Sequence, residues 1–159
     1  MFINCVVNNM YNNANATLAI NSIIKQSTYN GWKSNNLHLY NCVISNTNYI
    51  NGTHASNCIQ VGSAFPSSVE TVDCMTVDSY SDVFENWNGN FAVDADYSLK
   101  EEIATGFLGT DGTEVGIFGG LMPYDPRPSY LLLYRCTVAG RTTIDGKLSV
   151  DVEVVTGDQ

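Results

Sequence analysis

The stretch Leu37-His38-Leu39-Tyr40-Asn41-Cys42-Val43-Ile44 decides the fold, because its Asn-Cys step and the apolar residues after it recur along the first half of the chain. The related copies are Asn4-Cys5-Val6-Val7, Asn21-Ser22-Ile23-Ile24, Asn57-Cys58-Ile59-Gln60 and Asp73-Cys74-Met75-Thr76. Short self-similar units can bury their apolar side only against their neighbours, which is the pattern of stacked coils. The sequence therefore predicts an all-β repeat architecture, and it names no reaction.

The spacing of the copies leaves two coil lengths open. The Cys position recurs at residues 5, 22, 42, 58 and 74, so the steps are 17, 20, 16 and 16 residues. Apolar residues around it and Asn, Gly and Ser between copies predict short strands separated by turns. Asn suits the bend because it tolerates left-handed backbone geometry, and stacked Asn side chains can hydrogen-bond in a ladder. Sixteen residues is short for a three-sided coil, so a 32-residue coil from Cys42 to Cys74, with an insertion around Cys58, is the alternative.

Four of the five cysteines occupy the same place in the repeat, which predicts a column of buried small side chains. Residues on in-register strands lie about 4.8 Å apart with parallel side chains, which fits poorly the torsion of roughly 90° in a disulfide. Disulfides or a metal are the other interpretations. The chain has no C-x-x-C pair, so a zinc site has little support, and the sequence implies no cofactor.

Charge is divided unevenly along the chain. Residues 1–68 contain two lysines and no acid, whereas residues 69–159 contain all sixteen acids and five Lys or Arg, so the two parts carry +2 and −11. An acidic chain without a basic cluster is a poor candidate for binding nucleic acid or an anionic membrane surface. The chain contains no apolar run of eighteen residues, so the sequence predicts no transmembrane segment. The repeat begins at residue 2 without a polar cap or a signal peptide, so we expect the C-terminal part of a longer protein.

The character of the sequence changes after Asn90, and three further segments follow. Glycines punctuate residues 109–120, which predicts a turn, a short strand and another turn. Prolines then predict a stiff linker. Residues 130–138 and 148–155 are strand-like and joined through Asp145-Gly146, a strong turn signal. We therefore expect coils and a closing segment at 1–120, a Pro-rich linker at 121–129 and a β-hairpin tail at 130–159, which can pair with another chain or with the rest of the parent protein.

The unit Asn41-Cys42-Val43-Ile44-Ser45-Asn46 resembles the coils of right-handed parallel β-helix proteins of the pectate-lyase-like superfamily. Asp96-Tyr97-Ser98-Leu99, followed by the Gly-rich residues 112–120, resembles the closing segment of secreted or surface β-helix proteins of gut-type bacteria. The resemblance covers residues 1–120 and implies a right-handed parallel β-helix in an extracellular or cell-surface protein. The superfamily includes polysaccharide lyases, glycosidases, phage tailspikes and adhesins, so the fold alone does not settle function.

Three residues at the same repeat position form the first candidate site. His38, His54 and Glu70 each stand four residues before the Cys position, so 16-residue coils would stack them in one column. Two His and a carboxylate can hold a divalent metal or polarise a sugar hydroxyl. A solvent-facing polar column is the simpler interpretation.

Acids and tryptophans supply the other candidates. The carboxylates nearest the coils are Asp73, Asp78, Asp82 and Glu85. Two of them facing each other across a cleft would suit glycoside hydrolysis, although they are equally interpretable as turn residues on a solvated face. Trp32 and Trp87 lie among turn residues, which predicts exposed rings for stacking against sugars.

Together these features favour a non-catalytic portion of a secreted or cell-surface protein that contacts polysaccharide or other glycans, or serves as a rigid scaffold. One alternative is the C-terminal part of a polysaccharide lyase or glycoside hydrolase. Another is an adhesin or a phage-fibre-like assembly module.

Overall fold

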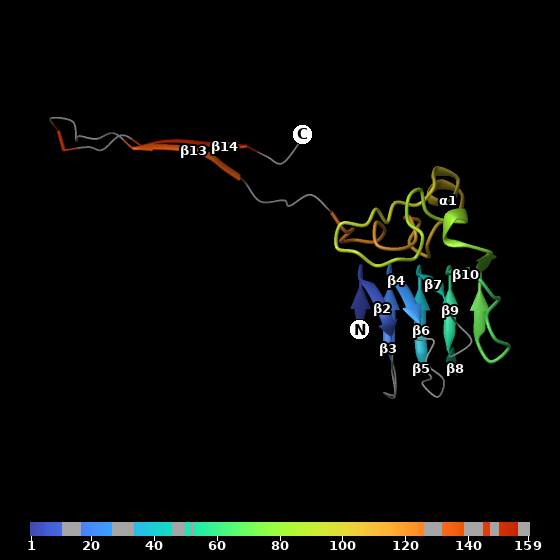
Figure 1. Ribbon diagram of the computed structural model, residues 1–159. Helices are drawn as coiled ribbons and strands as arrows, with labels where there is room; N and C mark the ends of the chain where they lie inside the picture. The colour runs from blue at the N-terminus through green and yellow to red at the C-terminus, as the bar shows by residue number, and fades with distance from the viewer. Residues whose placement is uncertain are drawn as a thin grey trace. The chain divides into compact units, whose positions relative to one another are not determined.

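The computed structural model describes residues 1–10, 17–26, 34–45, 50–51, 53–125, 132–138, 145–146 and 150–155. The chain divides into two compact units, Met1–Tyr124 and Asp125–Gln159. Within the first unit the strands stand side by side, and the residues after the repeat run across one end of them (Figure 1). Trp32, residues 126–129 of the expected linker and residues 130–131 of the expected tail lie outside the described residues.

Two five-stranded parallel sheets build the first unit. Sheet A has the order β1 (Phe2–Ile3), β3 (Thr17–Ile20), β6 (Leu37–Tyr40), β9 (His54–Ser56) and β11 (Glu70–Val72). Sheet B contains β2 (Val6–Met10), β4 (Ile23–Gln26), β7 (Val43–Ser45), β10 (Ile59–Val61) and β12 (Met75–Val77) in chain order. A short parallel pair joins β5 (Ser34–Asn35) to β8 (Ile50–Asn51). Each sheet A strand leads through one bend into a sheet B strand, and we call such a pair a rung. The predicted parallel β-helix is confirmed.

The strand register settles the coil length. His38 pairs with His54, and His54 pairs with Glu70, so successive rungs are 16 residues apart in this part of the chain. Val43, Ile59 and Met75 follow the same step in sheet B. The 32-residue alternative is therefore wrong. Sixteen residues suffice because the strands of these rungs are only three or four residues long and lie mainly in two sheets.

The Asn-Cys step makes the bend between the two sheets. Asn4, Asn21, Asn41, Asn57 and Asp73 all have positive φ, between 46° and 56°. That region strains most residues and suits Asn and Asp. The next side chain closes the bend, since the Cys42 thiol donates to the Tyr40 carbonyl at 3.2 Å and the Ser22 hydroxyl donates to the Ile20 carbonyl at 2.8 Å. This shared bond explains why Ser22 can replace Cys in the second copy.

The inner core lies between the two sheets. Its buried members are Ala19, Ile24, Leu37, Leu39, Cys42, Ile44, Ala55, Cys58 and Val69. Cys42 and Cys58 are fully buried, Cys5 and Cys74 are half-buried, and all four are free thiols. The predicted column of small buried side chains is therefore confirmed for the middle rungs. Burial raises the pKa of Cys58 well above its usual range, with the neighbouring Cys42 thiol adding to the rise, so Cys58 is a neutral packing residue.

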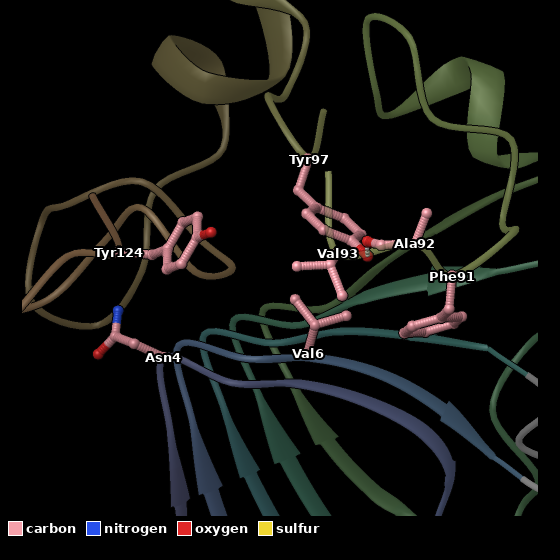
Figure 2. Close-up of a pocket in the computed structure, with 7 residues that line it drawn as sticks. All are labelled: Asn4, Val6, Phe91, Ala92, Val93, Tyr97 and Tyr124. Atoms are coloured by element: carbon pink, nitrogen blue, oxygen red, sulfur yellow. Dashed lines mark hydrogen bonds between the residues drawn. The ribbon is translucent and has the colours of Figure 1, made fainter. Parts of the chain in front are cut away.

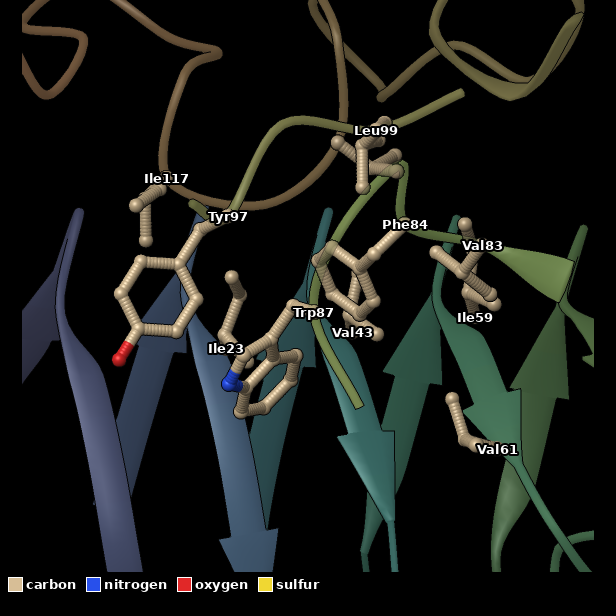
Figure 3. Close-up of a cluster of buried hydrophobic side chains, with 11 residues drawn as sticks. Ile23, Val43, Ile59, Val61, Val83, Phe84, Trp87, Tyr97, Leu99 and Ile117 are labelled. Carbon is tan, nitrogen blue, oxygen red and sulfur yellow. The ribbon is translucent and has the colours of Figure 1, made fainter. Parts of the chain in front are cut away.

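A second core covers the outer face of sheet B. After β12 comes the 3₁₀ helix η2 (Tyr80–Asp82), and residues 83–124, which we call the closing segment, then fold onto that face. Val83, Phe84, Trp87, Tyr97, Leu99, Val115 and Ile117 pack there on Ile23, Val43, Ile59 and Val61. Figure 3 shows the rings of Phe84, Trp87 and Tyr97 lying over these strands. We call this cluster the outer core.

Two details of the closing segment differ from the sequence expectation. Residues 115–118 form no strand, because Gly116 has φ of +80° and turns the chain between two buried apolar residues. A short helix, α1 (Glu101–Gly106), was not expected. Among the described residues no helix is long and apolar enough to span a membrane.

The second unit contains the expected two-stranded extension. Strand β13 (Leu132–Val138) pairs antiparallel with β14 (Val150–Val155), and the register shifts between Leu133 and Arg135. The turn residues Asp145 and Gly146 lie between them in sequence, and Gly146 has φ of +77°. The predicted hairpin pairing is confirmed for these strands.

Candidate functional site

The outer face of sheet A is the candidate site, because the closing segment covers sheet B and leaves this face free in the described part of the chain. In β6 the side chains alternate, with Leu37 and Leu39 buried, His38 exposed and Tyr40 half-buried. In-register pairing extends this alternation to the other rungs. The residues at the outward register positions, which we call the open face, are Ile3, Leu18, Ile20, His38, Tyr40, His54, Ser56, Glu70 and Val72, and of these Ser56 is buried.

The predicted column of His38, His54 and Glu70 stands on the open face. His54 Nδ1 lies 3.4 Å from Glu70 Oε2, where the Glu70 side chain is 78% exposed and that of His54 is 26% exposed. The rings of His38 and His54 lie 6.5 Å apart between centroids. No group of three His, Cys, Asp or Glu side chains in the described chain is arranged to hold a metal ion. The column is therefore a line of polar side chains with a single carboxylate, that of Glu70, at its end.

Tyr40 adds an aromatic ring to this column from the neighbouring register position. Its ring centroid lies 5.7 Å from that of His54, with an interplanar angle of 44°. The sequence analysis named Trp32 and Trp87 as the rings for stacking and did not single out Tyr40. The alternation of Leu37 and Leu39 with His38 and Tyr40 was the sequence signal that Tyr40 faces outward. The open face thus carries three adjacent rings with polar edges.

The four acids proposed for catalysis lie in different structural environments. Asp73 is the exposed bend residue of the last rung, and Glu85 is exposed in the closing segment. Asp82 Oδ2 accepts bonds from the Ser79 amide and hydroxyl, both at 2.8 Å, and these bonds lower the pKa of Asp82. Through these bonds Asp82 forms a capping box with Ser79, the N-cap residue of the helix η2. Its carboxylate has a structural role.

Asp78 lines a pocket between sheet B and the start of the closing segment. The pocket holds about 370 Å³ over sheet B and is also lined by Ser45, Ser79, Tyr80 and Asn88, among others. The Tyr80 hydroxyl lies 2.6 Å from the Ser45 hydroxyl at its wall. Glycoside hydrolysis needs two carboxylates that face each other, and the described lining supplies one.

The expectation that Trp87 exposes its ring is wrong. The side chain is 4% exposed, and its ring meets Phe84 and Phe91 edge to face at 4.8 Å and 5.2 Å between centroids. Its indole Nε1 donates to the Asn90 carbonyl at 2.6 Å, which satisfies the one polar atom. Polar turn residues surround Trp87 in sequence, but the outer face of sheet B needs a large ring to cover it. Trp87 is thus an outer-core residue, and Trp32 lies outside the described residues.

Comparisons of the chain with protein-family models, with curated proteins and with solved structures each find no match. The functional interpretation therefore depends on the geometry above.

Proposed function

We propose that this chain is a non-catalytic, glycan-contacting part of a secreted or cell-surface β-helix protein of the pectate-lyase-like kind, and that the open face is its contact surface. The single observation that carries the proposal is the asymmetry of the two sheets. The closing segment covers the outer face of sheet B with the outer core, whereas the outer face of sheet A leaves aromatic rings and their polar atoms accessible.

The chemistry of the open face suits a sugar chain. Tyr40, His54 and His38 each carry a flat ring with a hydrogen-bonding atom. Amphipathic rings of this kind pack on the apolar patches of a sugar while their polar atoms bond to its hydroxyls. The rings stand on consecutive parallel strands, whose spacing of about 4.8 Å is fixed by backbone hydrogen bonds. A rigid row loses little conformational entropy on binding. An extended ligand can therefore lie along the row.

The charge of the open face favours a neutral glycan. Glu70 is its only carboxylate among the described residues, and no Lys or Arg stands on it. A uronate polymer would meet the Glu70 carboxylate, and apart from the two histidines the open face offers no cationic group to offset the repulsion. The proposal therefore names neutral polysaccharides as the ligand class.

Retention of the full chain on a panel of neutral and uronate polysaccharides tests this function. We expect retention by at least one neutral glycan, and a loss of about tenfold in affinity for Tyr40→Ala, equal to about 1.4 kcal/mol. The matched control is Tyr124→Ala, which removes a partly exposed tyrosine away from the open face. Wild-type protein that binds no neutral glycan, or equal binding by both variants, would overturn the proposal.

A further inference from the structure

The pocket beside Asp78, which we call the Asp78 pocket, stands on the carboxyl ends of two neighbouring strands of sheet B. Ser45 ends β7 and Val61 ends β10, the two residues pair in register, and they are 4% and 5% exposed. Gly62 follows Val61, and nothing lies within 4 Å of the place where a Cβ would stand on it. The floor of the pocket is therefore packed, while the space beside Gly62 stays open.

The Tyr80 side chain forms a fixed wall of the Asp78 pocket. Its hydroxyl lies 2.6 Å from the Ser45 hydroxyl, and its ring meets the Trp87 ring edge to face at 4.9 Å between centroids. A Cβ on Gly89 would overlap the Tyr80 ring, so the backbone of the closing segment packs directly against it. These contacts hold Tyr80 in place before a ligand arrives, which lowers the entropy cost of binding.

The hydroxyls of Ser79 and Ser81 have assigned directions. Ser79 Oγ donates to Asp82 Oδ2 at 2.8 Å and lies 2.8 Å from Ser81 Oγ. A serine hydroxyl has one hydrogen, and that of Ser79 points to Asp82, so the Ser81 hydroxyl must be the donor to Ser79. The lone pairs of the Ser81 oxygen are then left to accept. Ser81 therefore offers the pocket an acceptor.

Asp78 and Asn88 supply the polar groups that the fold leaves uncommitted. Among the described residues, no hydrogen bond or ion pair joins the Asp78 carboxylate to another group. Asn88 Oδ1 accepts from the Asn90 amide at 3.1 Å, so the hydrogens on Nδ2 are the donors that Asn88 can offer. The described lining contains no Lys, Arg or His. The pocket thus combines a free carboxylate with a hydroxyl acceptor and an amide donor.

A second pocket of the first unit, of about 400 Å³, shows that this polar lining is not general (Figure 2). Apolar and aromatic side chains dominate it, among them Val6, Phe91, Val93 and Tyr97, and its described lining has no carboxylate. The Asp78 pocket is therefore chemically distinct, with polar groups set around the small apolar floor of Val61.

We propose that the Asp78 pocket binds one ring of a neutral sugar, either a free hexose or the non-reducing end of a glycan. Each sugar hydroxyl both donates and accepts, so neighbouring hydroxyls can donate to the Asp78 carboxylate and to Ser81 Oγ while accepting from Asn88 Nδ2. The C–H side of the ring packs on Val61. An alkylammonium group carries donors only and would leave the Asn88 donors unmatched, and a uronate would be repelled by Asp78.

The size of the pocket fits a single ring. Its volume of about 370 Å³ is at the small end of the range of about 300–1,000 Å³ found for small-molecule sites. The pocket uses the ends of sheet B strands and η2, whereas the open face belongs to sheet A. The inference is therefore independent of the glycan contact proposed for the open face.

Titration of the isotope-labelled full chain by NMR tests the proposal, with D-glucose, D-galactose and D-mannose as probes. We expect saturable shifts of the Gly62, Ser81 and Asn88 amides for at least one hexose, with a Kd of about 1–10 mM. D-Galacturonate and propylamine should bind about tenfold more weakly or not at all. The methyl glycoside of the bound hexose separates the two sources, since equal binding identifies a chain end and lost binding identifies the free sugar, and both support the proposal.

Variants locate the binding. Asp78→Asn keeps the size of an exposed side chain, so it leaves the fold intact, and it should weaken hexose binding about tenfold because the charge-assisted bonds are lost. Glu85→Gln makes the same change of charge outside the described lining and should bind like wild type, as should Tyr40→Ala on the open face. The proposal is overturned by the absence of saturation with every hexose up to about 100 mM, by equal binding of Asp78→Asn and wild type, or by propylamine binding more tightly than any hexose.

Discussion

At the scale of single residues, the bend asparagines have two roles. Their backbone turns the chain between the sheets, and their side chains hold the closing segment. Asn41 Oδ1 accepts from the Thr110 amide at 2.8 Å, and Asn57 Nδ2 donates to the Leu108 carbonyl at 3.0 Å. Within the row, Asn41 Nδ2 lies 3.4 Å from Asn21 Oδ1. The predicted ladder exists at this step, but the asparagines also bond to a segment more than fifty residues away.

Substitution of Asn41 separates the two roles. Asn41→Ala places an alanine at φ of 56° and leaves the Thr110 amide without its acceptor. The left-handed backbone costs about 1–2 kcal/mol and the lost bond about 1–3 kcal/mol. Asn41→Gly removes only the bond, so it should be less destabilising by about the backbone cost. Urea unfolding of the three proteins measures this difference, and equal stability of the two variants would show that the backbone conformation is unimportant.

At the scale of elements, the closing segment depends on close approach to the bend row. A Cβ atom on Gly119 would overlap the Glu114 carbonyl and stand 2.7 Å from Asn21 Nδ2. A Cβ on Gly109 would meet the Asn41 side chain at 2.7 Å. Glycine at these two positions lets the backbone lie directly on the asparagine side chains. The irregular path of this element is therefore set by contacts with the coils.

Alanine at two glycines tests that dependence. Gly119→Ala forces the closing segment away from the bend row and should destabilise the fold by about 1–3 kcal/mol, as overpacking does. Gly106→Ala is the control, because its Cβ meets nothing within 4 Å at the end of α1. The control should change stability by less than about 1 kcal/mol, with a gain expected. Thermal unfolding compares the two, and a neutral Gly119→Ala would mean that the segment can adopt another path.

The same element shows what the sequence can predict. The strands and bends follow from the Asn-Cys step, because each is a local pattern that repeats. The six residues of α1 are too few to give a helical period, and buried Val115 and Ile117 look like a strand until Gly116 turns the chain between them. The burial of Trp87 depends on a long-range contact with sheet B, which no local signal reports. The open face could have been predicted from Leu37 and Leu39 once the coil length was known.

At the scale of the whole molecule, the two sheets of the first unit present different outer faces. The outer core covers the outer face of sheet B, whereas the outer face of sheet A is open in the described part of the chain. A rigid stack suits contact on the open face, because its neighbours fix each rung in register.

Truncation at two positions tests where the first unit ends. The sequence predicts a boundary after Gly120, and the first compact unit of the structure extends to Tyr124, whose amide donates to the Ile117 carbonyl and whose ring lies 6.0 Å from that of Phe118. A chain ending at Tyr124 keeps these contacts and should melt within about 2 °C of the full chain, whereas one ending at Gly120 should melt about 4 °C lower or more, because about 1 kcal/mol is lost. Residues 125–159 alone should lack a cooperative transition, since a two-stranded hairpin is marginally stable. A large loss of stability in the chain ending at Tyr124 would instead show that the β-helix needs the hairpin.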